Sequence, residues 1–205
     1  MRVTLFDYGA GNLHSLAKAL EGPATSVRIE TDPVRAVDAD TDVLVLPGVG
    51  AFGAATERLA PGREAMRDAI LRGLPTIGIC LGMQLLFDGS DEGDGAGLGV
   101  LAGRVTRLRA VRVPQIGWNQ LVPAEHEPLF VAAPLDMVYY ANSYVCRPAD
   151  TGAVTAWTEH EGDRFPAAVR AGRAVGVQFH PEKSSTQGVR FLRAFLDDAR
   201  TTESQ

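Results

Sequence analysis

Cys80 is the residue of this chain whose surroundings best fit a nucleophile. It is the centre of residues 78–82, which have the pattern Gly-x-Cys-x-Gly between a short apolar run and a stretch with helical spacing. This pattern is typical of a sharp strand-to-helix turn, where the flanking glycines leave room for neighbouring segments. The central thiol would then lie at the amino end of a helix, which favours the thiolate. The N–H of Leu81 could be one donor of an oxyanion hole. The alternative is a buried structural cysteine, our interpretation of Cys146, which lacks this context.

A nucleophilic cysteine needs a base that a third group holds in place. His180 ends an expected strand and is followed by Pro181 and Glu182. Residues two apart in an extended segment face the same way, so Glu182 can reach the imidazole and fix its tautomer. Alone, this tripeptide would be interpreted as a surface turn, but the cysteine turn earlier in the chain reverses that preference. The other three histidines are expected to be solvated, and they are His14, His126 and His160.

A glycine-rich loop, residues 46–53, follows the apolar run at residues 43–46. Its three glycines allow backbone N–H groups to turn toward a developing oxyanion. Loops at the carboxyl ends of parallel strands build the sites of α/β sheets. We therefore expect this loop beside Cys80, with the N–H of Val49 as a second donor. The glycines after the first strand match neither nucleotide-binding fingerprint, so nucleotide binding is not supported.

The elements that would position these residues follow an α/β pattern, because short apolar runs alternate with amphipathic stretches. Strands are expected at residues 3–6, 26–29, 43–46 and 75–79, and helices at 12–20, 63–72 and 81–87. After a loop at residues 89–99, the second half has β character at 104–108, 137–146, 153–158, 165–170 and 174–179, then a helix at 186–199. This predicts one α/β domain at residues 1–200, with a mainly parallel central sheet flanked by helices. Antiparallel hairpins are added in the second half, and residues 201–205 form a polar tail.

Composition narrows the function classes. The chain has 205 residues, 45% of them hydrophobic, and a formal charge of -5. These values fit a globular domain and argue against a nucleic-acid-binding surface. No apolar run approaches the length needed to cross a membrane, and no signal peptide is visible. Two cysteines are too few for a disulfide framework and lack metal-ligand spacing. We expect a cytoplasmic protein without a metal.

Three blocks of the chain resemble class I (triad) glutamine amidotransferases, namely residues 47–53, 78–84 and 180–184. Two further blocks, residues 7–13 and 116–119, narrow the resemblance. Within this family, they are most similar to the glutaminase subunits that supply ammonia for the synthesis of imidazole glycerol phosphate. The blocks together span the chain from end to end.

The resemblance implies that Cys80 attacks the side-chain amide of L-glutamine, His180 passes the proton to the leaving ammonia, and Glu182 completes the triad. It implies no cofactor. The partner would be a cyclase subunit with a (β/α)₈ barrel, in a heterodimer. The cyclase would use the channelled ammonia to make imidazole glycerol phosphate and aminoimidazole carboxamide ribotide, in histidine biosynthesis. Family positions that bind glutamine fall on Gly50, Gln84, Glu92, Ser143 and Tyr144. Family positions at the partner interface and ammonia passage fall on Asn12, Trp118, Tyr139 and Lys183.

The chain departs from the family pattern at Asn142 and Gln115, where the family often has histidine. Asn142 replaces a titratable group by an amide, and neither departure touches the triad. Three alternatives stay open. The first is a glutaminase subunit for anthranilate, aminodeoxychorismate or pyridoxal phosphate synthesis, which Trp118 and Asn12 disfavour. The second is a catalytically silent regulatory domain, which the filled triad disfavours. The third is a stand-alone cysteine hydrolase.

Overall fold

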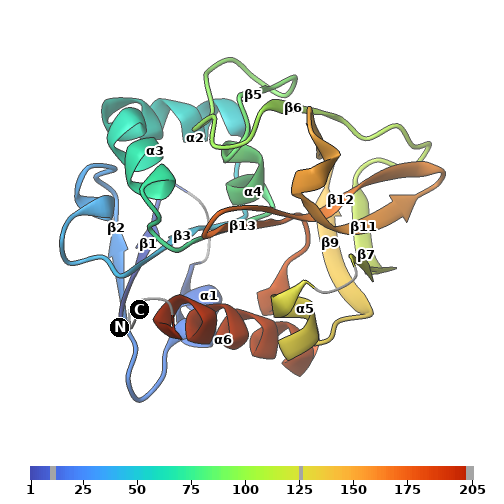
Figure 1. The fold of residues 1–205 in the computed structure, drawn as a ribbon. Coiled ribbons are helices and arrows are strands. Elements are labelled where there is room, and N and C mark those ends of the chain that lie inside the picture. The colour runs from blue at the N-terminus through green and yellow to red at the C-terminus, as the bar shows by residue number, and fades with distance from the viewer. Residues whose placement is uncertain (10–12, 125–126, 202–205) are drawn as a thin grey trace.

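A central β-sheet organises the molecule in the computed structural model, which describes residues 1–9, 13–124 and 127–201 (Figure 1). The strand order of this sheet is β2-β1-β3-β4-β13-β12-β11-β8. The first five strands in this order run parallel to their neighbours, and the last three are antiparallel. Their bounds are β1 Arg2–Phe6, β2 Ser26–Glu30, β3 Val43–Leu46, β4 Thr76–Ile79, β8 Val122–Pro123, β11 Val154–His160, β12 Asp163–Ala171 and β13 Ala174–Val177.

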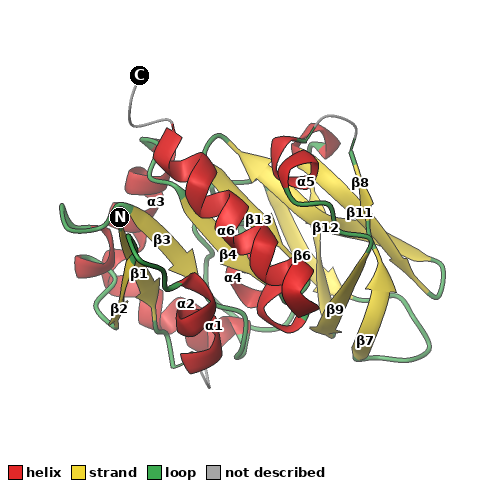
Figure 2. Ribbon diagram, turned by 90° about the horizontal axis from the view of Figure 1, so that it is seen from below, coloured by secondary structure: helices red, strands yellow, loops and turns green. Residues whose placement is uncertain are grey.

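Helices cover both faces of the sheet, as Figures 1 and 2 show. One face carries α1 (His14–Leu20), α5 (Pro128–Ala132) and α6 (Ser185–Thr201), and the other carries α2 (Phe52–Leu59), α3 (Arg63–Leu71) and α4 (Leu81–Leu85). The central strands β3, β4 and β13 are therefore buried along their whole length, which explains why they consist of uninterrupted small or apolar residues rather than an alternating pattern. The expected single α/β domain with a mainly parallel sheet is confirmed.

Two small sheets extend the second half of the chain. One has the order β10-β6-β5, and the other pairs β7 with β9. Their bounds are β5 Gly89–Ser90, β6 Gly103–Arg107, β7 Gln115–Gln120, β9 Met137–Asn142 and β10 Tyr144–Pro148. The continuous β stretch that the sequence predicts at residues 137–146 is in fact divided at Ser143. The residues before it pair with β7 and those after it pair with β6, so the chain passes from one small sheet to the other there.

Several element bounds differ from the sequence prediction. The helix α2 begins at Phe52, inside the segment expected to be loop, and the helix α4 ends two residues earlier than expected, at Leu85. A distant carboxylate explains the first difference, because Glu92 Oε2 accepts a hydrogen bond of 3.0 Å from the backbone N–H of Phe52. The last helix is longer than expected and includes Thr201. Short 3-10 helices lie at Arg35–Val37, Ala60–Gly62, Thr151–Ala153 and Pro181–Lys183.

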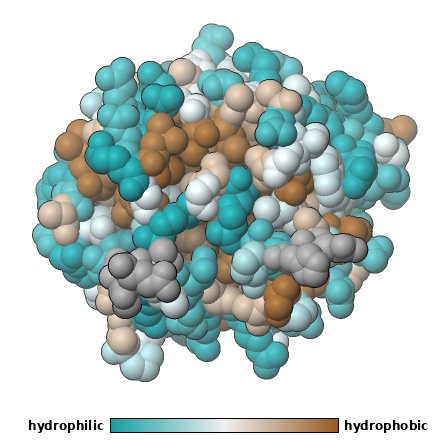
Figure 3. Space-filling view, in the orientation of Figure 1, coloured by the Kyte–Doolittle hydropathy of each residue, from teal (hydrophilic) through white to brown (hydrophobic). Residues whose placement is uncertain are grey.

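The surface seen in Figure 3 is mostly hydrophilic, with hydrophobic residues gathered in smaller patches. Within the described residues, no helix combines the length and the apolar character that crossing a membrane requires. The same residues contain no group of three or more histidine, cysteine, aspartate or glutamate side chains that could hold a metal ion.

Candidate active site

Cys80 is the single residue between strand β4 and helix α4. Its backbone angles are φ 48° and ψ −102°, a region that a non-glycine residue adopts only when the surroundings enforce it. The backbone N–H of Cys80 donates to the carbonyl oxygen of Val177 on β13 at 2.7 Å, which helps to hold this conformation. The sharp strand-to-helix turn expected from the sequence is confirmed.

The two glycines that flank Cys80 are required by close contacts. A Cβ atom on Gly82 would lie 2.0 Å from the carbonyl oxygen of Leu46 on β3. A Cβ atom on Gly78 would lie 2.5 Å from the carbonyl oxygen of Gly82. Real Cβ atoms do not approach backbone so closely, so any larger residue at either position would move Cys80 or the neighbouring strand.

His180 and Glu182 form a directly bonded pair. His180 Nδ1 lies 2.8 Å from Glu182 Oε1, and the His180 side chain is 1% exposed. The contact predicted from the sequence is therefore confirmed, although the local geometry differs from the prediction. The strand β13 ends at Val177, and Glu182 belongs to a 3-10 turn, so the turn brings the carboxylate to the ring. The backbone N–H of His180 donates to the carbonyl oxygen of Tyr139 at 2.8 Å, which fixes the segment against β9.

The pKa of His180 is raised from 6.5 to about 9. Burial by itself lowers this pKa, because it disfavours the charged imidazolium. The interactions of the ring with the side chains of Cys80 and Glu182 act in the opposite direction and outweigh burial. The raised pKa favours the protonated form of the ring beside Cys80. A protonated base beside a cysteine is the arrangement that favours a reactive thiolate.

We expect Glu182→Gln to move the alkaline limit of activity to lower pH. The imidazolium of His180 is lost as the pH rises through about 9, and with it the proton that a leaving amine needs. The amide oxygen introduced by Glu182→Gln can still accept a hydrogen bond from His180 Nδ1, but it lacks the negative charge that raises the pKa of His180. The measurement is kcat/KM against pH for L-glutamine, the substrate expected from the sequence, in the variant and the parent. An unchanged alkaline limb would show that Glu182 does not set this pKa.

The glycine-rich loop after β3 lies directly against Cys80 and His180, as expected. A Cβ atom on Gly48 would lie 2.9 Å from His180 Cε1 and 3.2 Å from the Cβ of Cys80. The imidazole and the cysteine side chain therefore meet at this loop. Two residues further on, Gly50 has a φ of +132°, a conformation that residues with side chains rarely adopt.

A cavity of about 220 Å³ opens beside Cys80. It is lined by the two residues whose N–H groups are expected to form an oxyanion hole, Val49 and Leu81. Leu81 is the first residue of α4, where a backbone N–H has no partner within the helix. The cavity is also lined by every position that the family resemblance assigned to glutamine binding, namely Gly50, Gln84, Glu92, Ser143 and Tyr144.

Glu92 connects this cavity to the rest of the fold. Its carboxylate accepts from the N–H of Phe52, the first residue of α2, and its own backbone N–H donates to Ser90 Oγ at 3.0 Å. A carboxylate at a helix amino terminus is stabilised by the helix dipole. Glu92 thus joins the loop at residues 89–99 to the end of the glycine-rich loop.

Gln178 is a site residue that the sequence reasoning did not identify. Its side chain is fully buried, and Nε2 donates to Cys80 Sγ at 3.4 Å. The signal that could have revealed it is spacing, because Gln178 precedes His180 by two residues at the end of the strand that the sequence predicts at residues 174–179, where such residues face the same way. His160, expected in a solvated loop, instead ends β11, with its Nε2 3.1 Å from the carbonyl oxygen of Arg112. His126 lies outside the described residues.

The two departures from the family pattern lie opposite each other. Gln115 on β7 is the cross-strand neighbour of Asn142 on β9, and both side chains are buried. Asn142 lines the cavity and donates from Nδ2 to the carbonyl oxygen of Tyr144 at 3.2 Å. Among the described residues, its Oδ1 and both polar atoms of the Gln115 side chain have no hydrogen-bond partner. The two departures are therefore neighbours in the fold, and Asn142 is the one that lines the cavity.

The residues expected at a partner interface also lie close together. Trp118 and Tyr139 are cross-strand neighbours on β7 and β9, with their rings in an edge-to-face contact at 6.3 Å. Trp118 is 52% exposed. The backbone N–H of Tyr139 donates to Ser184 Oγ, next to the exposed Lys183. Asn12, the fourth expected interface residue, lies outside the described residues.

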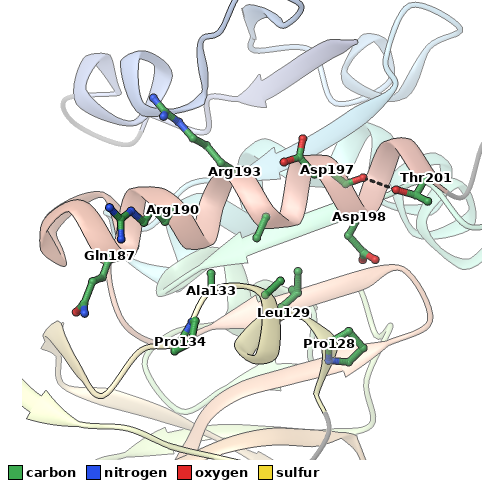
Figure 4. A pocket seen from close by; sticks show the side chains of 12 residues that line it. Pro128, Leu129, Ala133, Pro134, Gln187, Arg190, Arg193, Asp197, Asp198 and Thr201 are labelled. Carbon is green, nitrogen blue, oxygen red and sulfur yellow. Dashed lines mark hydrogen bonds between the residues drawn. The ribbon is translucent and has the colours of Figure 1, made fainter.

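A second cavity, of about 320 Å³, shares part of the glycine-rich loop with the first as its wall. Gly48 and Val49 line both cavities, and Glu182 and Lys183 line only the second. A larger hollow of about 720 Å³ lies between α5 and α6 (Figure 4). It contains none of the predicted site residues, and its polar side chains, which include Arg190, stand along α6. We therefore take the cavity beside Cys80 as the candidate active site.

Comparison with known proteins agrees with this site. The family model for class I glutamine amidotransferases matches residues 4–199. The chain is 45% identical over 204 residues to the imidazole glycerol phosphate synthase subunit HisH of Halobacterium salinarum, covering 95% of this chain and 92% of that protein. It is 42% identical over 196 residues to HisH of Pyrococcus furiosus, covering 95% of this chain and 97% of that protein. A crystal structure of a glutamine amidotransferase superposes with a TM-score of 0.72 at 21% identity, covering 97% of this chain and 98% of that one.

The chain is therefore a member of the class I glutamine amidotransferases. Within that class it belongs to the family of HisH subunits of imidazole glycerol phosphate synthase. The relatives favour this subunit over the glutaminase subunits for anthranilate, aminodeoxychorismate or pyridoxal phosphate synthesis that the sequence left open.

Proposed function

We propose that this chain hydrolyses L-glutamine to glutamate and ammonia through Cys80, His180 and Glu182, and delivers the ammonia to a cyclase subunit. The observation that carries the proposal is the buried His180–Glu182 pair, bonded at 2.8 Å and placed against a strained cysteine turn. Three groups with these roles, held by two segments that are far apart in sequence, form a nucleophile, a base and an orienting carboxylate. A cysteine nucleophile needs a reduced thiol, so we place the reaction in the cytoplasm.

In the first half of the reaction, the Cys80 thiolate attacks the side-chain amide carbon of glutamine and forms a carbon–sulfur bond. The carbonyl oxygen becomes an oxyanion, which the N–H groups of Leu81 and Val49 would receive. His180 then gives its proton to the amide nitrogen, the carbon–nitrogen bond breaks, and ammonia leaves. The enzyme keeps the glutamyl group as a thioester on Cys80.

In the second half, neutral His180 takes a proton from water as the water oxygen attacks the thioester. The tetrahedral intermediate collapses, the carbon–sulfur bond breaks, and glutamate is released with the thiolate restored. Glu182 holds the ring in one tautomer through both halves and stabilises its charged form. Gln84 and Glu92 line the cavity where the α-ammonium of the substrate would need acceptors.

We place the partner on the side of the molecule that carries Trp118, Tyr139 and Lys183. Exposed aromatic side chains are enriched at protein interfaces, and Ile116 and Met137 add apolar surface on the same two strands, being 68% and 44% exposed. The cavity lined by Glu182 and Lys183 is separated from Cys80 only by the loop at Gly48. We propose that ammonia passes this way into a (β/α)₈-barrel cyclase, which makes imidazole glycerol phosphate and aminoimidazole carboxamide ribotide.

The test is reconstitution. The chain is mixed with a purified cyclase subunit, the N-linked ribulose phosphate substrate and glutamine, and glutamate and imidazole glycerol phosphate are measured together. We expect one product molecule for each glutamine consumed. Glutamine hydrolysis without any cyclisation, across a range of cyclase concentrations, would contradict the assignment of the partner. No hydrolysis in the presence of the cyclase would contradict the assignment of the reaction.

We expect Lys183→Ala to weaken the coupling between the two reactions more than it weakens folding. Lys183 is exposed beside the second cavity, and an ion pair with a carboxylate of the partner would gain strength as docking removes water. The measured quantity is the ratio of glutamine consumed to cyclised product, together with the thermal unfolding midpoint. The exposed Lys18 on α1 provides a matched control, because Lys18→Ala removes the same charge at a residue that lines neither cavity. A ratio unchanged in Lys183→Ala would rule out this role.

A further inference from the structure

Gln178 connects the nucleophile to the substrate cavity. Its side chain is fully buried between Cys80 and Gln84. From Nε2 it donates to Cys80 Sγ at 3.4 Å, and its Oε1 accepts from Gln84 Nε2 at 3.3 Å. Both ends of one amide are therefore occupied by residues that line the candidate active site.

The bonds of Gln84 determine which of its atoms can meet a substrate. Its Nε2 donates both to Gln178 Oε1 and to the carbonyl oxygen of Tyr144, the latter at 3.0 Å. The two N–H bonds of the amide are then both used, so Oε1 is the atom left to accept a hydrogen bond. An acceptor at this wall of the cavity suits the α-ammonium of glutamine. Gln178 helps to hold Gln84 in that orientation.

A buried amide at position 178 needs an explanation. Moving an amide from water into an apolar interior costs free energy unless its hydrogen bonds are replaced, and an apolar side chain of similar size would avoid that cost. The donor is also neutral. It can stabilise negative charge on sulfur without competing with His180 as a cation and without taking up the proton that the reaction moves.

We propose that Gln178 is a further catalytic residue, whose amide N–H stabilises the anionic sulfur of Cys80 while its carbonyl oxygen orients Gln84 toward the substrate. This role rests on the proposed function. A hydrogen bond to the charged form of an acid favours that form, so the thiolate is more populated at a given pH. The same bond assists the breakdown of the thioester intermediate, because negative charge returns to sulfur when the carbon–sulfur bond breaks.

Several titratable side chains also lie near Cys80, and His180 is one that hydrogen-bonds its sulfur. They are His180, Tyr8, Cys146, Tyr144 and Glu92. Burial raises the pKa values of Tyr8 and Cys146 well above their usual range, so both stay neutral. His180 is the cationic partner of the thiolate. Gln178, two residues earlier in the chain, is a separate hydrogen-bond donor to the same sulfur and carries no charge.

The first test measures the thiol itself and needs no catalytic activity. The rate at which iodoacetamide alkylates Cys80 is followed against pH by mass spectrometry in Gln178→Met, Gln178→Glu and the parent, with Cys80→Ala as the blank. We expect the midpoint of the Gln178→Met profile to move up by about one pH unit, which is roughly a tenfold loss of thiolate at a fixed pH below the midpoint. In Gln178→Glu the carboxylate, as the stronger acid, holds the negative charge, so its midpoint rises further.

A merely structural role would give a different result. The Gln178 variants would then unfold at lower temperature while their alkylation profiles stayed like that of the parent, and this outcome overturns the proposal. Gln178→Glu keeps the shape of the side chain, so it remains informative if Gln178→Met does not fold. Gln187→Met, an exposed glutamine on α6, is the matched control and should leave the profile unchanged.

The second test separates the two bonds of Gln178 by kinetics in the complex with the cyclase. Gln178→Met should lower kcat/KM for glutamine by about 10- to 100-fold, as expected for loss of a hydrogen bond to a charged group. Gln84→Met should raise KM without moving the alkylation midpoint of the free enzyme. The reason is that Gln84 Nε2 donates to Gln178 Oε1 and to the carbonyl oxygen of Tyr144, not to the sulfur of Cys80. Equal midpoint shifts in both variants would contradict the division of roles. Failure of the proposed function would appear separately, as glutaminase activity retained in Cys80→Ala.

Discussion

Cys80→Ala is expected to lower glutamine-dependent synthesis by the complex by about 10⁶-fold, the scale on which removal of a nucleophile acts. Ammonia-dependent synthesis should stay nearly intact. The reason for the contrast is that, in the proposed mechanism, Cys80 forms the thioester from which ammonia is released but takes no part in the cyclase reaction. The measurement compares the two rates in the same preparation, once with glutamine and once with an ammonium salt at a pH where free ammonia is present.

Two further variants sharpen this result. His180→Ala should cause a loss of similar size, because a nucleophile and its base act as a unit rather than additively. Cys146→Ala is the matched control for loss of a thiol. Cys146 is buried on β10, and burial raises its pKa well above the usual range, so glutaminase activity should persist in this variant. Loss of both the glutamine-dependent and the ammonia-dependent rate in Cys80→Ala would mean that the site assignment or the division of labour is wrong.

The second large effect concerns the partner. The isolated chain should hydrolyse glutamine slowly, and the cyclase with its nucleotide substrate should raise kcat about 100-fold or more. An oxyanion hole needs two donors, and in the proposed site Leu81 at the start of α4 would supply one. The other would come from Val49, between Gly48 and Gly50, where the peptide units can rotate and turn a carbonyl inward instead. A missing donor costs about 3 kcal/mol of transition-state stabilisation.

The position of this loop explains how a partner could reach it. Val49 lines both the cavity beside Cys80 and the cavity beside Lys183, so a protein docked at the second cavity contacts the wall of the first. Docking that favours the donor-inward state would raise kcat far more than it lowers KM. The test is glutaminase kinetics on the chain alone, with the cyclase, and with cyclase plus nucleotide, using Cys80→Ala for the background. Full activity in the isolated chain would refute the idea that the partner controls the loop at Val49. It would leave the triad assignment standing.

Signals between near neighbours in the sequence were enough to predict the local parts of this site. The apolar run before Cys80, the helical spacing after it and the two flanking glycines predicted the strand, the helix and the sharp turn between them, because these signals lie within a few residues of one another. The pair of His180 and Glu182 was predictable for the same reason. The glycine-rich loop could be placed beside Cys80 because parallel strands end at a common edge.

Contacts between segments that are distant in sequence could be known only from the fold. The start of α2 at Phe52 depends on the carboxylate of Glu92, forty residues away, and the division of the β stretch at Ser143 depends on two different partner strands. Gln178 became recognisable as part of the site only when its amide was seen between Cys80 and Gln84, which are 98 and 94 residues away. Periodicity and turn signals describe neighbours along the chain, whereas a hydrogen bond of this kind exists only after the sheet has brought the segments together.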